Sequence, residues 1–274
     1  MKSLCIKTNN KNSINYILSE LENLKIENTY YVLKDFKNFT NIIIHYTGEN
    51  IDDFYSEISS VLSYLVLDNY EETIFKKILS QNYFYFDKFE LETIISICFE
   101  ILDDNLDFSI DDRFIILFNS FYNYIYYKKK LFLTGFINFR LKKYFLFLEN
   151  IVDIAVNKYI IEREYIEFIS LLKYYINSNK STCNVVHLLY TSSGSCLFDE
   201  HNNLIDTSKI KLDSTYLSDI SFSENDYILN ALLTLLPQKI IIHIDEPYDD
   251  FINTLKLVFE KRIIFEKKLL GFGK

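Results

Sequence analysis

Histidine is the side chain that acts most often as acid, base or metal ligand near neutral pH, and three of the four histidines in this sequence lie in apolar segments typical of strands. These are His45, His187 and His243. If the strands of His187 and His243 are neighbours, the two imidazoles can share one face and meet at a cleft, so they are the candidate catalytic residues. The alternative is that each is a hydrogen-bonded core histidine.

Metal and cofactor sites are not predicted. Asp245 and Glu246 follow His243 closely, but neighbouring residues of a strand point to opposite faces, so only the loop after Ile244 can bring them together. The cysteines are far apart and form no CxxC pair, which suits neither a disulfide framework nor a zinc site. They are Cys5, Cys98, Cys183 and Cys196.

The common catalytic motifs are absent from the sequence. It contains no GxGxxG, no Walker-type glycine loop, no GxSxG, no HExxH and no EF-hand loop. The chain has only 5 glycines, so a backbone cradle for phosphate is hard to build. Nucleotide enzymes of the common kinds are therefore disfavoured, and whether the protein is an enzyme stays open.

A basic segment interrupts an acidic chain. The net charge is −9, yet residues 113–148 contain seven Lys and Arg residues and no Asp or Glu. Lys128, Lys129 and Lys130 lie among tyrosines, and cations interleaved with aromatic rings can bind single-stranded nucleic acid. The alternative is a solvated helix connection whose lysines balance an acidic neighbour, and the overall negative charge favours it.

The scarcity of Gly and Pro favours long helices and few tight turns, and 49% hydrophobic residues suffice for a real core. We predict a mixed α/β, or α+β, fold of one or two domains. Its parts are a small α/β unit over 1–69, a helical region over 70–179 and a C-terminal mixed-sheet α/β unit over 180–274.

Hydrophobic periodicity predicts the individual elements. In the first part we expect strands 3–7, 29–34 and 41–46, with helices over 13–24 and 51–67. Segment 41–46 is a continuous apolar run, which is typical of a central strand buried on both faces. The stripe from Leu141 to Tyr159 predicts two or more helices, and residues 165–176 predict the last helix of the region.

The period changes after residue 182. Three short strands over 185–190, 195–199 and 203–206 predict an antiparallel meander. Further elements are expected as helix 228–236, strand 239–244, helix 249–259 and strand 262–266. Alternation of helices with apolar strands favours at least one crossover connection.

The first residues lack the apolar core and cleavage site of a secretory signal, and no apolar run approaches the roughly 20 residues needed to cross a bilayer. We therefore expect a cytoplasmic protein with no membrane span.

Three stretches resemble a known family: FINFRLKKY at 136–144, VDIAV at 152–156 and EYIEFISLLKY at 164–174. The later pattern fits as well, with KIIIH at 239–243 and TLKLVFE at 254–260. Over residues 131–266 the chain resembles the YtxC-like family, whose members are assigned to sporulation in endospore-forming bacteria. The resemblance implies a role in sporulation and no particular chemistry. Members often end in a cysteine-bearing tail, which residues 263–274 lack.

Asn138 and Arg140 lie within the first of these stretches and are the candidate ligand-binding residues. On a helix, Phe136, Arg140 and Tyr144 share one face. Arg140 then either pairs with a carboxylate such as Asp153 or Glu164, or presents its guanidinium to an anionic ligand.

Three functions follow from these patterns. The first is a non-enzymatic interaction or structural protein of the sporulating cell with an unknown protein partner. The second is an enzyme or small-ligand binder using His187 and His243 with Arg140. The third is a nucleic-acid binder acting through Lys128, Lys129 and Lys130.

Overall fold

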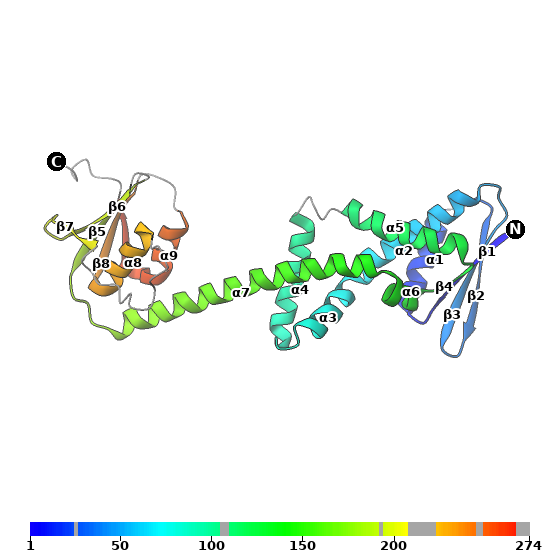
Figure 1. The fold of residues 1–274 in the computed structure, drawn as a ribbon, viewed down its shortest axis with the longest axis horizontal. Coiled ribbons are helices and arrows are strands. Elements are labelled where there is room, and N and C mark those ends of the chain that lie inside the picture. The colour runs from blue at the N-terminus through cyan, green and yellow to red at the C-terminus, as the bar shows by residue number, and fades with distance from the viewer. Residues whose placement is uncertain (25–26, 105–109, 192–193, 208–222, 245–248, 267–274) are drawn as a thin grey trace. The chain divides into compact units, whose positions relative to one another are not determined.

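The computed structural model describes residues 1–24, 27–104, 110–191, 194–207, 223–244 and 249–266. The chain forms two compact units, Met1–Ile161 and Glu162–Lys274. Each unit combines helices with a mixed sheet, which confirms the predicted α+β fold (Figure 1). The predicted division at residues 69/70 and 179/180 stays a prediction.

The first unit is built on a four-stranded sheet of order β2-β3-β1-β4. Its strands are β1 (Lys2–Thr8), β2 (Thr29–Phe36), β3 (Phe39–Tyr46) and β4 (Lys130–Phe132). Strand β3 pairs antiparallel with both β1 and β2, whereas β4 joins β1 in parallel. The first three strands were predicted. The fourth was not, because three residues are too few to show a period.

One face of this sheet is buried and the other is open. Leu4, Ile6, Ile42 and Ile44 are fully buried, whereas their strand neighbour Ile43 is only half-buried. The central position predicted for β3 is therefore right, but burial on both of its faces is wrong. Alternation of apolar and polar residues would have shown which face of the strand is buried, but an unbroken apolar run hides this alternation. In the first unit, helices cover only one face of the sheet.

The helices of the first unit lie on the buried side of the sheet (Figure 1). They are α1 (Lys11–Leu24), α2 (Ile51–Asn69), α3 (Glu71–Asn82), α4 (Lys88–Asp104), α5 (Ile110–Tyr127) and α6 (Leu133–Arg140). Helix α2 shows why they begin where they do. Its N-cap Asn50 accepts a hydrogen bond from the backbone of Asp53, and acidic residues occupy the first turn.

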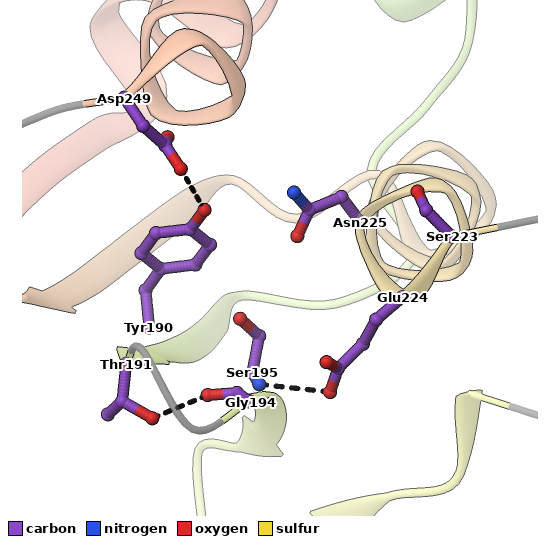
Figure 2. A pocket seen from close by; sticks show the side chains of 8 residues that line it. All are labelled: Tyr190, Thr191, Gly194, Ser195, Ser223, Glu224, Asn225 and Asp249. Carbon is purple, nitrogen blue, oxygen red and sulfur yellow. Dashed lines mark hydrogen bonds between the residues drawn. The ribbon is translucent and has the colours of Figure 1, made fainter.

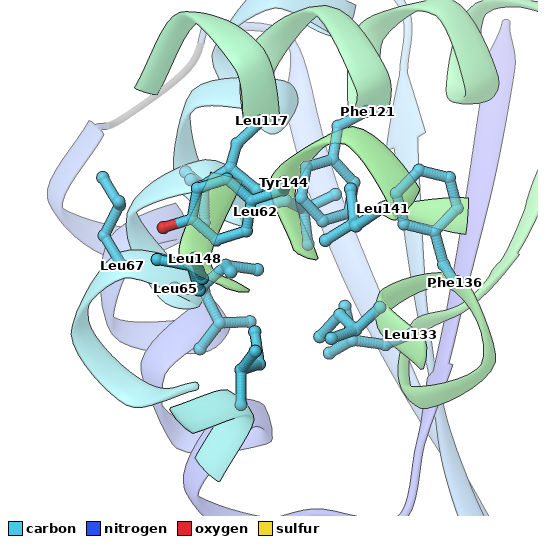
Figure 3. Packing of buried hydrophobic residues seen from close by; sticks show 14 of the residues in the cluster. Leu62, Leu65, Leu67, Leu117, Phe121, Leu133, Phe136, Leu141, Tyr144 and Leu148 are labelled. Atoms are coloured by element: carbon cyan, nitrogen blue, oxygen red, sulfur yellow. The ribbon is translucent and has the colours of Figure 1, made fainter. Parts of the chain in front are cut away.

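Figure 3 shows the core that α2, α5 and α6 form with the start of α7 (Lys142–Ser178). Leu62, Leu117, Phe121 and Leu148 are fully buried there, and Tyr144 lies among them with its hydroxyl inside the core.

Helix α7 is one continuous helix of 37 residues, so the predicted break into two or more helices is wrong. No Gly or Pro occurs between 142 and 178, and nothing else in the segment stops the hydrogen-bond ladder. The boundary between the two units falls inside this helix, after Ile161. No helix in the described ranges is long and apolar enough to cross a membrane.

The second unit has a five-stranded sheet of order β7-β6-β5-β8-β9. Its elements are β5 (Val185–Thr191), β6 (Gly194–Asp199), β7 (Leu204–Ile205), α8 (Glu224–Leu235), β8 (Lys239–Ile244), α9 (Asp250–Phe259) and β9 (Ile263–Glu266). The antiparallel meander β5-β6-β7 is as predicted, while β8 lies parallel to β5 and β9. Val186, Leu188, Ile240 and Ile242 share a core with α8 and α9.

Candidate functional site

The structure brings His187 and His243 together. They lie on neighbouring parallel strands, where His187 is paired with Ile241 and His243 with Leu189. Both therefore point to the face opposite to α8 and α9. His187 Nδ1 and His243 Nε2 are 3.0 Å apart, and the two rings stack with an interplanar angle of 13°.

The surroundings of His243 favour its neutral form. Burial lowers the pKa of His243, the neighbouring His187 lowers it further, and Glu266 on β9 opposes the shift. Since His243 is only 1% exposed, it has little access to solvent or to a substrate. One ring donates and the other accepts, so their mutual hydrogen bond already uses a nitrogen of each.

No metal site surrounds the pair within the described part of the chain. Asp245 and Glu246, which the sequence places after His243, lie outside the described residues. Among the residues the structure does describe, no group of three or more His, Cys, Asp and Glu side chains is arranged to hold a metal ion.

Lowering the pH should destabilise the chain through His243. Its pKa is depressed in the folded state, so the unfolded chain binds more protons, and stability falls as the pH drops through about 6.5 towards the folded pKa. We expect His243→Gln to remove up to about 1.4 kcal/mol per pH unit of this dependence. Urea unfolding of both proteins between about pH 7.5 and pH 5.5 measures it. Parallel pH profiles would contradict a neutral His243.

A pocket of about 350 Å³ lies near the carboxyl end of β5, where the starts of α8 and α9 converge (Figure 2). Such positions often bind ligands in α/β sheets. Neither His187 nor His243 lines it, so the two candidate features do not coincide. Its lining residues are Tyr190, Thr191, Gly194, Ser195, Ser223, Glu224, Asn225 and Asp249.

Asp249 in this pocket has a structural partner for each oxygen. Its Oδ1 accepts from the backbone N–H of Ile252 at 2.9 Å, which caps α9, and its Oδ2 accepts from the Tyr190 hydroxyl. Burial by itself would raise the pKa of Asp249, but these hydrogen bonds hold it below the usual range. The carboxylate therefore stays ionised and serves the fold.

The other side of the pocket is engaged in the same way. Glu224 Oε1 accepts from the backbone N–H of Ser195 at 2.9 Å (Figure 2), and Ser223 with Asp226 forms a capping box at the start of α8. Both helix starts are thus satisfied by their own side chains. The carboxylates of Glu224 and Asp249 also line the pocket and would repel an anionic ligand.

Asn138 and Arg140 are exposed at the end of α6. The Lys77 ammonium donates to Asn138 Oδ1 at 3.1 Å. Asp153, one of the two predicted partners of Arg140, accepts instead from the hydroxyl of Tyr83 at 2.6 Å. No ion pair of Arg140 occurs among the described residues, and Arg140 and the histidine pair belong to different units.

The cations of the acid-free segment do not form one surface. Arg113 is buried and donates two hydrogen bonds to Glu71, at 2.7 and 2.8 Å. Lys128, Lys129 and Lys130 are exposed, but Lys129 lines a pocket of about 430 Å³ that also contains Glu49 and Asp52. Tyr122 and Tyr126 stack on each other with ring centroids 5.8 Å apart.

Sequence reasoning missed the open face of the first sheet. Strand pairing places the side chains of alternate residues together on the side of the sheet that none of the described helices of the first unit covers. These residues are Ser3, Cys5, Lys7, Tyr30, Val32, Lys34, Phe36, Phe39, Asn41, Ile43, His45, Lys130 and Phe132. We call this set the open face. The signal was present only as alternation within β1, because the apolar run of β3 hides the period of two.

The open face combines aromatic rings with cations. Tyr30 is 48% exposed, Phe36 55% and Phe132 49%. The Tyr30 ring stacks on His45 at 4.8 Å, and the Lys7 ammonium lies 3.4 Å from the centroid of Phe39. Aromatic rings this exposed leave apolar surface in contact with water, and a binding partner that covered the rings would bury that surface.

The family model of the YtxC-like family matches residues 56–264, which is most of the chain. The match confirms the resemblance seen over residues 131–266 and extends it towards the N-terminus. Strands β1, β2 and β3 precede the matched residues. No curated protein and no solved structure matches the chain.

Proposed function

Because the chain belongs to the YtxC-like family, we propose that it acts in the cytoplasm of the sporulating cell as a binding protein without a catalytic step of its own. The observation that carries this proposal is the open face. It presents half-exposed rings to solvent, whereas the two candidate catalytic histidines are hydrogen-bonded to each other.

The alternative, an enzyme or small-ligand binder using His187, His243 and Arg140, receives less support. A general base needs a free nitrogen within reach of a substrate. His243 is buried, and its Nε2 is hydrogen-bonded to His187. The pocket at the carboxyl end of β5 is lined by other residues.

Two variants distinguish the proposals in a sporulating strain that lacks the native gene. We expect Val32→Glu with Phe36→Glu to abolish complementation, because two buried charges would prevent a partner from covering the open face. We expect His187→Gln to complement normally. Protein level and melting temperature are measured for both. The reverse pattern, with a silent face variant and an inactive His187→Gln protein of normal stability, would establish the catalytic alternative.

A further inference from the structure

We infer that the open face of the first unit binds single-stranded nucleic acid. The inference rests on the proposed binding function and names the class of partner. Most of the open face lies outside the residues matched by the family, so the inference rests on residues of this chain alone.

The charge of the open face is opposite to that of the whole chain. Lys7, Lys34 and Lys130 lie on it, and no acidic residue does. Asp35 is the one acid in the four strands, and alternation turns its side chain away from the open face. It is exposed on the other side of β2 and accepts from the Thr40 hydroxyl at 2.6 Å. A chain of net charge −9 thus presents a locally positive surface that attracts phosphates.

The rings are placed for stacking. An open sheet whose exposed aromatics stack on unpaired bases is a recurrent mode of single-strand recognition. Lys7 already covers one side of Phe39, so Phe39 is the least available ring. The Tyr30 ring already stacks on His45, so Phe36 on β2 and Phe132 on β4 are the most available platforms, at opposite edges of the sheet and about 14 Å apart across three strand spacings.

Other occupants fit this face less well. A duplex keeps its bases inside and offers nothing for the rings to stack on. A second copy of the chain would bring lysines against lysines with no acid to pair them. An acidic protein could pair with the lysines. Its binding would not explain why the apolar side chains of the open face are aromatic, because aliphatic side chains would serve such a partner equally well.

The test measures binding of fluorescent single-stranded RNA, single-stranded DNA and a duplex of the same sequence to the full chain by anisotropy. Salt is varied from about 50 to about 200 mM. We expect one or both single strands to bind and the duplex to bind at least tenfold more weakly. The expected slope of log affinity against log salt is about −2, because three lysines contribute about −0.7 each.

Variants separate stacking from simple apolar contact. Phe36→Leu with Phe132→Leu keeps the apolar surface but removes two ring faces, and we expect at least about tenfold weaker binding. Lys7→Gln with Lys34→Gln should flatten the salt slope. Lys142→Gln with Lys143→Gln removes two exposed cations outside the open face and should leave affinity within about twofold. Circular dichroism verifies that each variant is folded.

The results of these experiments distinguish a failure of this inference from a failure of the proposed function. Absence of binding to either single strand at low salt overturns the inference. If the face variant Val32→Glu with Phe36→Glu then still fails to complement, the open face binds a protein and the proposed function stands. Binding that survives the leucine variant but is lost in the Lys142 and Lys143 variant would place the nucleic acid elsewhere and also overturn the inference.

Discussion

Replacing Arg113 with methionine is expected to lower the free energy of unfolding by about 3–5 kcal/mol, because it leaves a buried carboxylate without its charge partner. The Glu71 carboxylate accepts from Arg113 Nη1 through both oxygens and also from the Tyr144 hydroxyl. All three side chains are buried in the first unit (Figure 3 shows Tyr144). Urea unfolding followed by circular dichroism measures the loss, and hydrogen exchange in α5 locates it.

A triple variant is the matched control. Glu71→Leu, Arg113→Met and Tyr144→Phe remove every polar member of the cluster together, so no charge or hydroxyl is left unpaired. We expect the triple variant to be more stable than Arg113→Met alone by at least about 2 kcal/mol. A loss below about 1 kcal/mol in Arg113→Met would mean that Glu71 is protonated or hydrated in the folded chain.

The cluster of Glu71, Arg113 and Tyr144 also shows that the sequence could not reveal which charged side chains are paired in the fold. Arg113 opens the acid-free segment and counts among its seven cations, but its partner Glu71 lies 42 residues earlier. Residue types along the chain do not indicate which cations are neutralised from a distance. Lys130 is the counterexample within the same segment, since a three-residue strand places it on the open face.

Helices and strands could be predicted well from the sequence where one hydrophobic period, of helix or of strand, dominates a segment. The three short strands expected over 185–206 formed the predicted meander, and the expected end of helix 228–236 lies within one residue of the end of α8. Failures came where a pattern was uniform. Helix α7 looked divided because its apolar stripe drifts, although no residue in it stops a helix. The runs around Ile43 and Ile241 concealed which side chains face the core.

The histidine pair was within reach of prediction and the open face was not. His187 and His243 could be suspected of meeting because both stand in short strands of one unit, although strand order and register came only from the fold. Recognising the open face required knowing that helices cover a single side of the sheet. Only then do Lys34 and Asp35, neighbours in sequence, separate onto opposite faces.

The isoleucine run of β8 provides the second large expected effect. Ile242 is fully buried against α8 and α9, so Ile242→Ala should cost about 2–5 kcal/mol through lost burial and the cavity left behind. Ile241 is half-buried on the opposite face, and Ile241→Ala should cost less than half as much. The two substitutions delete the same atoms from adjacent residues of one strand, so propensity effects largely cancel.

Urea unfolding of both variants, with hydrogen exchange of the β5 and β8 amides, tests this difference. Equal losses would mean that both faces of β8 are sealed, and the histidine pair on the Ile241 side would then be a core contact with no access from outside. A larger loss for Ile241→Ala would contradict the pairing register of β8 with β5, because a shift of one residue exchanges the two faces of a strand. The expected order, Ile242 well above Ile241, places His187 and His243 on the less covered side of the sheet.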